Sequence, residues 1–106
     1  MTPEHKLMNE IRLWCGEHDF LCFRCNVGTH LLADNTYFST GLPKGFSDLL
    51  ILGYGIVCFC ECKVKGNKPS PEQITFLDEM SRRGFLTVVA YSVDDVSKLL
   101  QTICNT

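Results

Sequence analysis

Residues 46–64, with the sequence FSDLLILGYGIVCFCECKV, decide the fold of this 106-residue chain. Two apolar runs, at 46–52 and 56–64, flank a Gly-Tyr-Gly turn signal at 53–55. Runs rich in apolar, β-branched and aromatic residues on either side of a short glycine turn are typical of a β-hairpin. We therefore expect two adjacent antiparallel strands here.

The predicted hairpin brings two carboxylates together. If the chain turns at residues 54 and 55, Asp48 lies opposite Glu61, and a three-residue turn shifts this pairing by one position. Two carboxylates this close repel each other, so one resists ionisation unless a cation intervenes, and oxygen ligands suit Mg²⁺ or Mn²⁺. Lys63 shares the face of Glu61, because side chains alternate along a strand. The alternative is an ordinary ion pair of Lys63 with either acid on a solvent-exposed sheet face.

The segment 44–68 carries a net charge of +2 (four lysines minus two carboxylates), whereas the whole chain carries −2. The four lysines are Lys44, Lys63, Lys65 and Lys68. Such a patch suits an anionic substrate such as a phosphodiester, and Gly45 would let a backbone pass close by. Alternatively, the lysines only keep edge strands soluble. Arg24, in a predicted strand at 20–27, either reaches a phosphate or only borders the sheet.

Hydrophobic periodicity and turn signals predict the remaining elements. Apolar residues at helical spacing indicate a first helix over 3–17. A Ser-Pro-Glu-Gln capping-box pattern at 70–73 begins a second helix, which ends near residue 83. The other expected elements are strands at 20–27, 46–52, 56–64 and 85–91, a possible short strand at 37–39, and a last helix at 92–103. The order α-β-β-β-α-β-α predicts a mixed sheet flanked by helices.

Length and composition are those of one globular domain. Hydrophobic residues make up 45% and charged residues 21% of the chain. No apolar run has the roughly 20 residues of a membrane span. The N-terminus lacks a signal-peptide layout, so we expect a cytoplasmic protein. With a net charge of −2, the chain as a whole is not basic. A nucleic-acid partner would therefore have to bind a local basic patch or a bound metal.

Seven cysteines, an odd number without a secretory signal, argue against a disulfide framework. Cys58, Cys60 and Cys62 alternate on one strand, are spread over about 13 Å and face away from the acids, so we expect them to fill the core. Cys22 and Cys25 form a CxxC pair, so a thiol or zinc protein is a competing hypothesis. The three histidines are expected at the surface or in loops: His5, His18 and His30.

Three segments together resemble the VRR-NUC family of small nucleases, within the PD-(D/E)XK superfamily. They are PKGFSDLL at 43–50, FCECK at 59–63 and SPEQ at 70–73. The resemblance extends along nearly the whole chain, from the first helix to the last. Cys62 stands inside the E-x-K motif, where an aliphatic residue is more usual. We expect no functional consequence, because its side chain faces away from the acids.

The resemblance implies an α/β fold with a restriction-endonuclease-like αβββαβ core, a mixed central sheet flanked by helices, and a C-terminal helix. Residues 1–106 would form a single VRR-NUC-like nuclease domain. The implied function is a metal-dependent endonuclease that hydrolyses phosphodiester bonds in DNA and selects branched structures in the manner of Holliday-junction resolvases. The resemblance also implies a homodimer that acts in phage replication or repair, in the host-cell cytoplasm.

The resemblance further implies roles for single residues. Asp48 and Glu61 would ligate Mg²⁺ or Mn²⁺ with the Cys62 backbone carbonyl, and Lys63 would orient or activate the attacking water. Gln73 would position that water or the lysine, although it equally completes the capping box of its helix. The residues implied to contact substrate are Lys44, Gly45, Ser47, Arg24, Lys65 and Lys68.

The family pattern also expects an acid from the first helix, and both Glu4 and Glu10 are candidates. At about 100° per residue, Glu4 points with the apolar stripe towards the sheet, whereas Glu10 lies on its flank and could pair with Lys6. Helical geometry favours Glu4, and the resemblance leaves both open.

A competing hypothesis is a non-catalytic module that binds nucleic acid or protein on the same fold. It would be preferred if Asp48, Glu61 or Lys63 were missing, and all three are present.

Overall fold

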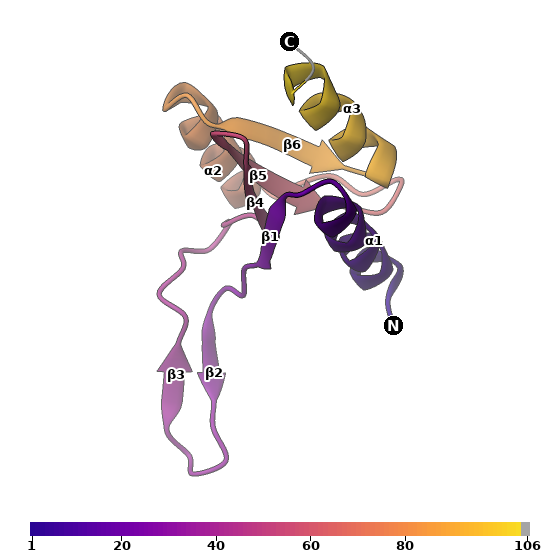
Figure 1. The fold of residues 1–106 in the computed structure, drawn as a ribbon. Helices are drawn as coiled ribbons and strands as arrows, with labels where there is room; N and C mark the ends of the chain where they lie inside the picture. The colour runs from indigo at the N-terminus through magenta and orange to yellow at the C-terminus, as the bar shows by residue number, and fades with distance from the viewer. Residues whose placement is uncertain (105–106) are drawn as a thin grey trace.

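The computed structural model describes residues 1–104. Its centre is a four-stranded sheet in the order β1 (Leu21–Arg24), β4 (Leu49–Gly53), β5 (Ile56–Cys62) and β6 (Leu86–Ala90). The β1–β4 and β4–β5 pairs are antiparallel, and β5 and β6 are parallel. Within the described residues three helices flank this sheet: α1 (Pro3–Glu17), α2 (Pro71–Arg82) and α3 (Val93–Cys104) (Figure 1). The predicted α/β fold, a mixed sheet flanked by helices with a helix at the C-terminal end, is confirmed.

Helix α1 forms where the sequence predicted it, because its start is capped and its apolar residues recur at helical spacing. The Thr2 hydroxyl accepts the His5 N–H at 3.1 Å, and Pro3 occupies the first turn, where no intrahelical donor is needed. The residues that α1 buries against the sheet and α3 are Leu7, Met8, Ile11 and Cys15. This packing fixes the rotation of α1, and with it the direction of its polar side chains.

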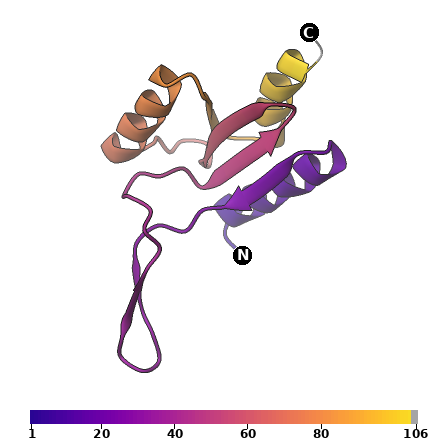
Figure 2. The same ribbon diagram turned by 60° about the vertical axis from the view of Figure 1, so that its left-hand side comes forward.

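The two faces of the sheet are packed differently. Helices α1 and α3 cover one face, and α2 lies on the other (Figures 1 and 2). Cys58, Cys60 and Cys62 are fully buried in the core under α1 and α3, as predicted for these thiols. On the opposite face Phe59 contacts the rings of Phe46, Phe76 and Phe85, with ring centroids 5.4 to 5.9 Å apart.

The hairpin register is the one predicted for a two-residue turn. Leu49 pairs with Cys60, and the pairing continues to Gly53 and Ile56. Tyr54 and Gly55 between them have φ values of 55° and 76°. Two successive positive φ values are those of a type I′ turn, whose twist matches the flanking strands. The register therefore carries Asp48, just before β4, towards the end of β5 that holds Glu61.

The segment between β1 and β4 forms an arm that projects from the body (Figures 1 and 2). It consists of β2 (Thr29–Leu31) and β3 (Tyr37–Ser39), paired as a separate two-stranded sheet. The short strand at 37–39 was expected, but its partner β2 was not, because residues 29–31 show no marked strand pattern. The predicted strand at 46–52 starts only at Leu49, since a turn closed by the Phe46 N–H and the Pro43 carbonyl precedes it.

No helix within residues 1–104 has the length and apolar character needed to cross a bilayer.

Candidate active site

Asp48 is held between two strands at the open end of the hairpin. Its Oδ2 accepts the backbone N–H of Cys62 at 2.9 Å, and its backbone carbonyl accepts the N–H of Cys25 at 2.8 Å. The first bond extends the β4–β5 contact beyond the strand pairing, and the second extends the β1–β4 contact. The Asp48 carboxylate is therefore fixed beside the end of β5, next to Glu61.

Glu61 is a buried acid with one satisfied oxygen. Its side chain is 1% exposed, and its Oε1 accepts a hydrogen bond from Gln73 Nε2 at 2.9 Å. Its Oε2 is buried and has no hydrogen-bond partner among the described residues. Burial, the adjacent Asp48 carboxyl and the more remote Glu4 together raise the pKa of Glu61 to about 8, against the opposing effect of Lys63. This pairing of the two carboxyls was predicted from the hairpin alone.

Lys63 lies beside Glu61, with its Nζ 3.7 Å from Glu61 Oε1 and its side chain only 15% exposed. Its backbone N–H donates to the Ala90 carbonyl at 3.0 Å, which ties this end of β5 to β6. The ion pair considered for these residues exists, but the sheet face that carries it is buried rather than solvent-exposed. A buried carboxyl between a half-buried carboxyl and an ammonium group is an unusual arrangement for purely structural residues.

Gln73 completes the capping box of α2 and also contacts Glu61, whereas its predicted role towards the attacking water or Lys63 stays a prediction. Its Oε1 accepts the Ser70 N–H at 2.8 Å, and the Ser70 hydroxyl accepts the Gln73 N–H at 3.2 Å, which together form the capping box of α2. Because the capping bond uses the amide oxygen, the amide nitrogen faces Glu61 and donates to it. The cap of α2 therefore orients the buried acid.

A cavity of about 320 Å³, which we call the Asp48 cavity, opens beside the Asp48 carboxyl. Asp48, Gln73 and Glu4 line it together with Arg24 and His5. Arg24 Nη2 donates to His5 Nε2 at 3.2 Å, so the two side chains form one polar wall of the cavity. His5 was expected only at the surface. It is exposed, but no sequence motif marks it, because only the rotation of α1 aims it at the cavity.

The structure distinguishes the two candidate acids of α1. Glu4 lines the cavity with Asp48 and is close enough to Glu61 to act on its pKa. Glu10 is exposed and lies in a separate hollow with Lys6 and Lys63. Helical geometry favoured Glu4, and the structure brings Glu4, not Glu10, to the carboxyl pair.

Among the residues predicted to contact substrate, Gly45 and Arg24 line the cavity. Gly45 has a φ of 92°, and a Cβ there would collide with the backbone carbonyl of Glu72 at the start of α2. A glycine is therefore required by this close packing, whatever passes through the cavity. Lys65 and Lys68 are exposed outside it.

Ser47 is fully buried, and its Oγ donates to the Leu49 carbonyl at 3.1 Å. It therefore shapes the chain before β4, and the structure gives its side chain no route to a substrate.

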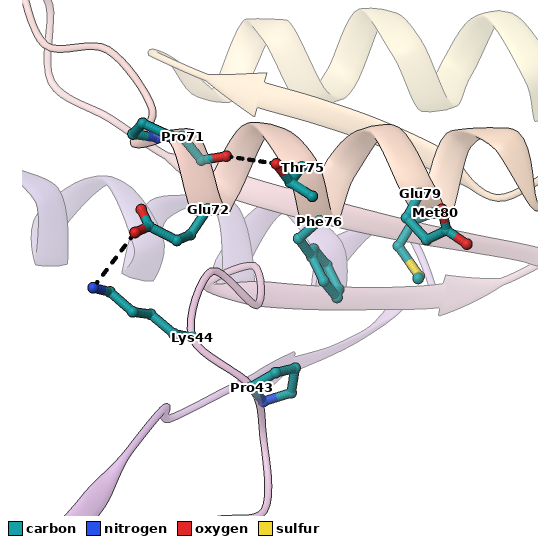
Figure 3. A pocket seen from close by; sticks show the side chains of 8 residues that line it. All are labelled: Pro43, Lys44, Pro71, Glu72, Thr75, Phe76, Glu79 and Met80. Carbon is teal, nitrogen blue, oxygen red and sulfur yellow. Dashed lines mark hydrogen bonds and ion pairs between the residues drawn. The ribbon is translucent and has the colours of Figure 1, made fainter.

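Lys44 lies over a different hollow, of about 440 Å³, between the segment before β4 and α2 (Figure 3). Its Nζ is 3.6 Å from Glu72 Oε1, and its side chain is 83% exposed. The other residues of this hollow include Pro43, Phe76 and Met80. An apolar hollow whose lysine already faces a carboxylate is poorly suited to a phosphate group, so we place the chemistry at the Asp48 cavity instead.

Cys22 and Cys25 do not form a shared thiol site. Cys22 packs against the core, where its thiol interacts with that of Cys15, whereas Cys25 lines the Asp48 cavity. Burial raises the pKa of the Cys25 thiol, opposite to the shift of a reactive cysteine, and the pKa of Cys22 is lowered chiefly by its bond with the buried Cys15 thiol. The placement of these two residues does not support the thiol or zinc hypothesis. Within residues 1–104, no three His, Cys, Asp or Glu side chains gather closely enough to hold a metal ion by themselves.

Comparison with known proteins identifies the fold. No family model and no curated protein matches the chain. Among solved structures, a "VRR_NUC domain" superposes with a TM-score of 0.73 at 23% sequence identity, covering 95% of this chain and 97% of that one. A "VRR_NUC domain protein" superposes with a TM-score of 0.68 at 19% identity, covering 94% and 86% of the two chains. The resemblance stated from the sequence is confirmed at the level of the fold.

Proposed function

We propose that this chain, which has the fold of the VRR-NUC domain, is a Mg²⁺- or Mn²⁺-dependent endonuclease that hydrolyses phosphodiester bonds in DNA. The observation that carries the proposal is the convergence of Asp48, the buried Glu61 and Lys63 at one end of the β4–β5 hairpin. Asp48 lines one open polar cavity and Lys63 a neighbouring hollow, and an acid pair with an amine in such a place is suited to a phosphodiester substrate.

The residues present fit a divalent cation. Glu61 Oε2 is buried and has no hydrogen-bond partner within residues 1–104, and the neighbouring Asp48 opposes ionisation of Glu61. A cation would satisfy that oxygen and remove the repulsion between the two carboxylates. Mg²⁺ is commonly held by one or two carboxylates and keeps several of its waters, so Asp48 and Glu61 suffice as side-chain ligands. The resemblance adds the Cys62 backbone carbonyl and Glu4 as ligands; Glu4 lines the cavity with Asp48 but does not form a three-residue cluster with Asp48 and Glu61 within residues 1–104. When bound, the metal supplies Lewis acidity and lowers the pKa of a coordinated water.

The remaining residues have separate tasks. Lys63, held next to Glu61, orients the attacking water and offsets the charge that develops on the phosphate. Gln73 fixes the orientation of the Glu61 carboxyl through its bond to Oε1. Arg24, on the far wall of the cavity, offers donors to a phosphate oxygen. Lys65 and Lys68, exposed along the chain after β5, attract the DNA backbone.

The finer assignments rest on the resemblance to the family. We propose that the preferred substrates are branched DNAs such as four-way junctions, and that the protein acts in phage replication or repair as a homodimer. A location in the host-cell cytoplasm stays a prediction. Residues 1–106 are proposed to act as one nuclease domain.

A cleavage panel tests the proposal. Linear duplex, flap and four-way-junction DNAs are incubated with the purified protein and Mg²⁺, Mn²⁺ or EDTA. We expect metal-dependent products, and a loss of at least roughly 100-fold in rate for Asp48→Asn and Lys63→Ala. Lys98→Ala is the matched control, because Lys98 is an exposed lysine on α3 paired with Asp94. Cleavage by both variants at the wild-type rate, with unchanged thermal stability, would refute the assignment. DNA binding without cleavage by the wild-type protein would favour the non-catalytic module.

A further inference from the structure

Three hollows form one continuous trough across the start of α1. The Asp48 cavity shares Glu4 and His5 with a second hollow of about 370 Å³. That hollow shares Pro3 and Val64 with a third, of about 500 Å³, which lies between α1, the segment after β5 and the start of α3. The trough therefore leads from the candidate active site, past the first turn of α1, to a hollow on the other side of that turn.

The third hollow holds three ammonium groups. Lys6, Lys63 and Lys65 line it, and we call it the lysine hollow. Lys63 Nζ also lies 3.7 Å from Glu61 Oε1, so this amine borders both the carboxyl pair and the lysine hollow. Lys6 and Lys65 are exposed, and neither forms an ion pair within residues 1–104. Two unpaired cations therefore lie next to the amine of the candidate active site.

The backbone that carries Lys65 has a defined position. The Asn67 N–H donates to the Val64 carbonyl at 3.0 Å, which closes a turn around Lys65 and Gly66. Tyr91, which follows β6 and lines the lysine hollow, donates its hydroxyl to the Asn67 carbonyl at 3.0 Å. The turn is therefore fixed against the end of β6, while the ammonium group of Lys65 is available to a ligand.

Two acids in the lysine hollow restrict the anion that it can bind. Glu10 and Asp94 also line it, so its side chains carry a net charge of +1 (three lysines minus two acids) in a chain of −2. The ion pair of Glu10 with Lys6, considered from the sequence, is not formed within the described residues. A phosphodiester carries one negative charge, whereas a terminal phosphate carries about −1.5 to −2 at neutral pH and would be repelled more strongly by the two acids.

We propose that the lysine hollow binds the DNA backbone phosphate next to the scissile one, with Lys6 and Lys65 as donors, so that one DNA strand lies along the trough. This inference rests on the proposed nuclease function and adds Lys6, which lies outside the basic segment 44–68, to the substrate-binding residues. Along one strand a phosphate recurs every roughly 3.4 Å of helix axis, so a strand whose scissile phosphate faces the carboxyl pair carries its next phosphate towards the neighbouring cations. Pro3 and Val64 line the trough before the lysine hollow and offer an apolar surface to the uncharged sugar.

DNA binding in EDTA tests the proposal separately from cleavage. The slope of log affinity against log salt concentration counts the phosphates that the protein neutralises. We expect Lys6→Gln and Lys65→Gln each to reduce that slope by about 1 and to weaken binding roughly fivefold to tenfold at about 0.1 M salt, for duplex and junction alike. Arg83→Gln is the matched control, because Arg83 is an exposed cation at the end of α2 that lines none of the three hollows. Glu10→Gln should act in the opposite direction and tighten binding, which a merely structural role of these residues would not produce.

A second readout changes the DNA instead of the protein. A neutral methylphosphonate replaces single phosphates in turn along one strand, again in EDTA. At one position the wild type should lose roughly tenfold in affinity, whereas the double variant Lys6→Gln, Lys65→Gln should lose much less. Where cleavage is observed, that position should adjoin the cleaved bond. Far-UV circular dichroism and thermal melting verify that each variant is folded.

The outcomes separate this proposal from the proposed function. An unchanged salt slope in both single variants, or the same methylphosphonate penalty in wild type and double variant, would overturn the lysine hollow as a phosphate site and leave the nuclease assignment intact. A reduced slope in a protein that shows no metal-dependent cleavage would refute the nuclease and support the phosphate site. A wild-type protein that binds no DNA would overturn both.

Discussion

The Glu61→Gln substitution should stabilise the metal-free protein at alkaline pH and change little at acidic pH. Glu61 has a pKa raised from its usual 4.5 to about 8, chiefly by burial and then by Asp48. A carboxyl with a raised pKa keeps its proton in the folded state longer than in the unfolded state. Its contribution to stability is therefore complete below about pH 4.5 and is lost as the pH rises through about 8.

The size of the effect follows from the shift. At about 1.4 kcal/mol per pKa unit, the rise from 4.5 to about 8 corresponds to at most roughly 4–5 kcal/mol. Because the titration of Glu61 is coupled to Asp48 and Lys63, the measured change is smaller than this limit. We expect the free energy of unfolding of the wild type to fall by at least about 2 kcal/mol between pH 5 and pH 9 in EDTA. This is a large fraction of the roughly 5–15 kcal/mol that stabilises a typical domain. A glutamine at this position still accepts the bond from Gln73 Nε2 and carries no charge at any pH.

Urea unfolding of wild type and Glu61→Gln in EDTA and reductant, at about pH 5 and about pH 9, measures the effect. The difference between the two proteins removes the contributions of other titrating groups. Adding Mn²⁺ at about pH 8 should stabilise the wild type by roughly 2–3 kcal/mol at one hundred times its dissociation constant, and the variant much less. Glu10→Gln, an exposed acid away from the site, should behave as wild type. A variant that is no more stable than wild type at about pH 9 would refute the reasoning, because Glu61 would then be ionised without cost.

Two substitutions and one measurement on the unaltered protein test separate parts of the structure. Glu4→Gln should weaken Mn²⁺ binding in calorimetry, whereas Glu10→Gln should not, since only Glu4 lines the Asp48 cavity; equal effects would mean that the rotation of α1 is wrong. Gly45→Ala should lower the free energy of unfolding in urea by more than about 2 kcal/mol, and Gly66→Ala by about 1 kcal/mol. Both glycines have a positive φ, but only a Cβ at Gly45 would collide with the backbone of Glu72. Similar losses in the two variants would contradict that packing. Amide exchange should be fast in β2 and β3, whose residues are all exposed, and slow in β5; strong protection of residues 29–31 would show that the arm is covered by another surface.

The core of the candidate site was predictable because it depends on short-range chain geometry. The turn at Tyr54 and Gly55 sets which residues of two adjacent strands face each other, and strand alternation then places Lys63 beside Glu61. Both steps use only local rules of turn length and pleat. The same holds for the helix caps, since a Ser-Pro-Glu-Gln pattern specifies its hydrogen bonds within four residues.

The arm was only half predicted, because the signals for β2 are weak. β3 carries the β-favouring Tyr37 and Phe38, but residues 29–31 form a strand only by pairing with it. Ser47 was predicted to contact substrate because it belongs to the family motif. Its burial depends on the turn before β4 and on the elements that close over it, which no local pattern describes.

By itself, the order of residues in this protein determined the hairpin, its register and the meeting of two acids with a lysine, since these depend on neighbours along the chain. Only the tertiary structure decided that Glu4 rather than Glu10 joins them, that His5 and Arg24 form a wall of the cavity, and that Glu61 is buried enough to hold its proton near neutral pH. These properties depend on how α1 is rotated against the sheet and on how much water α2 excludes. Both are set by packing between segments far apart in sequence, and no local pattern encodes that packing.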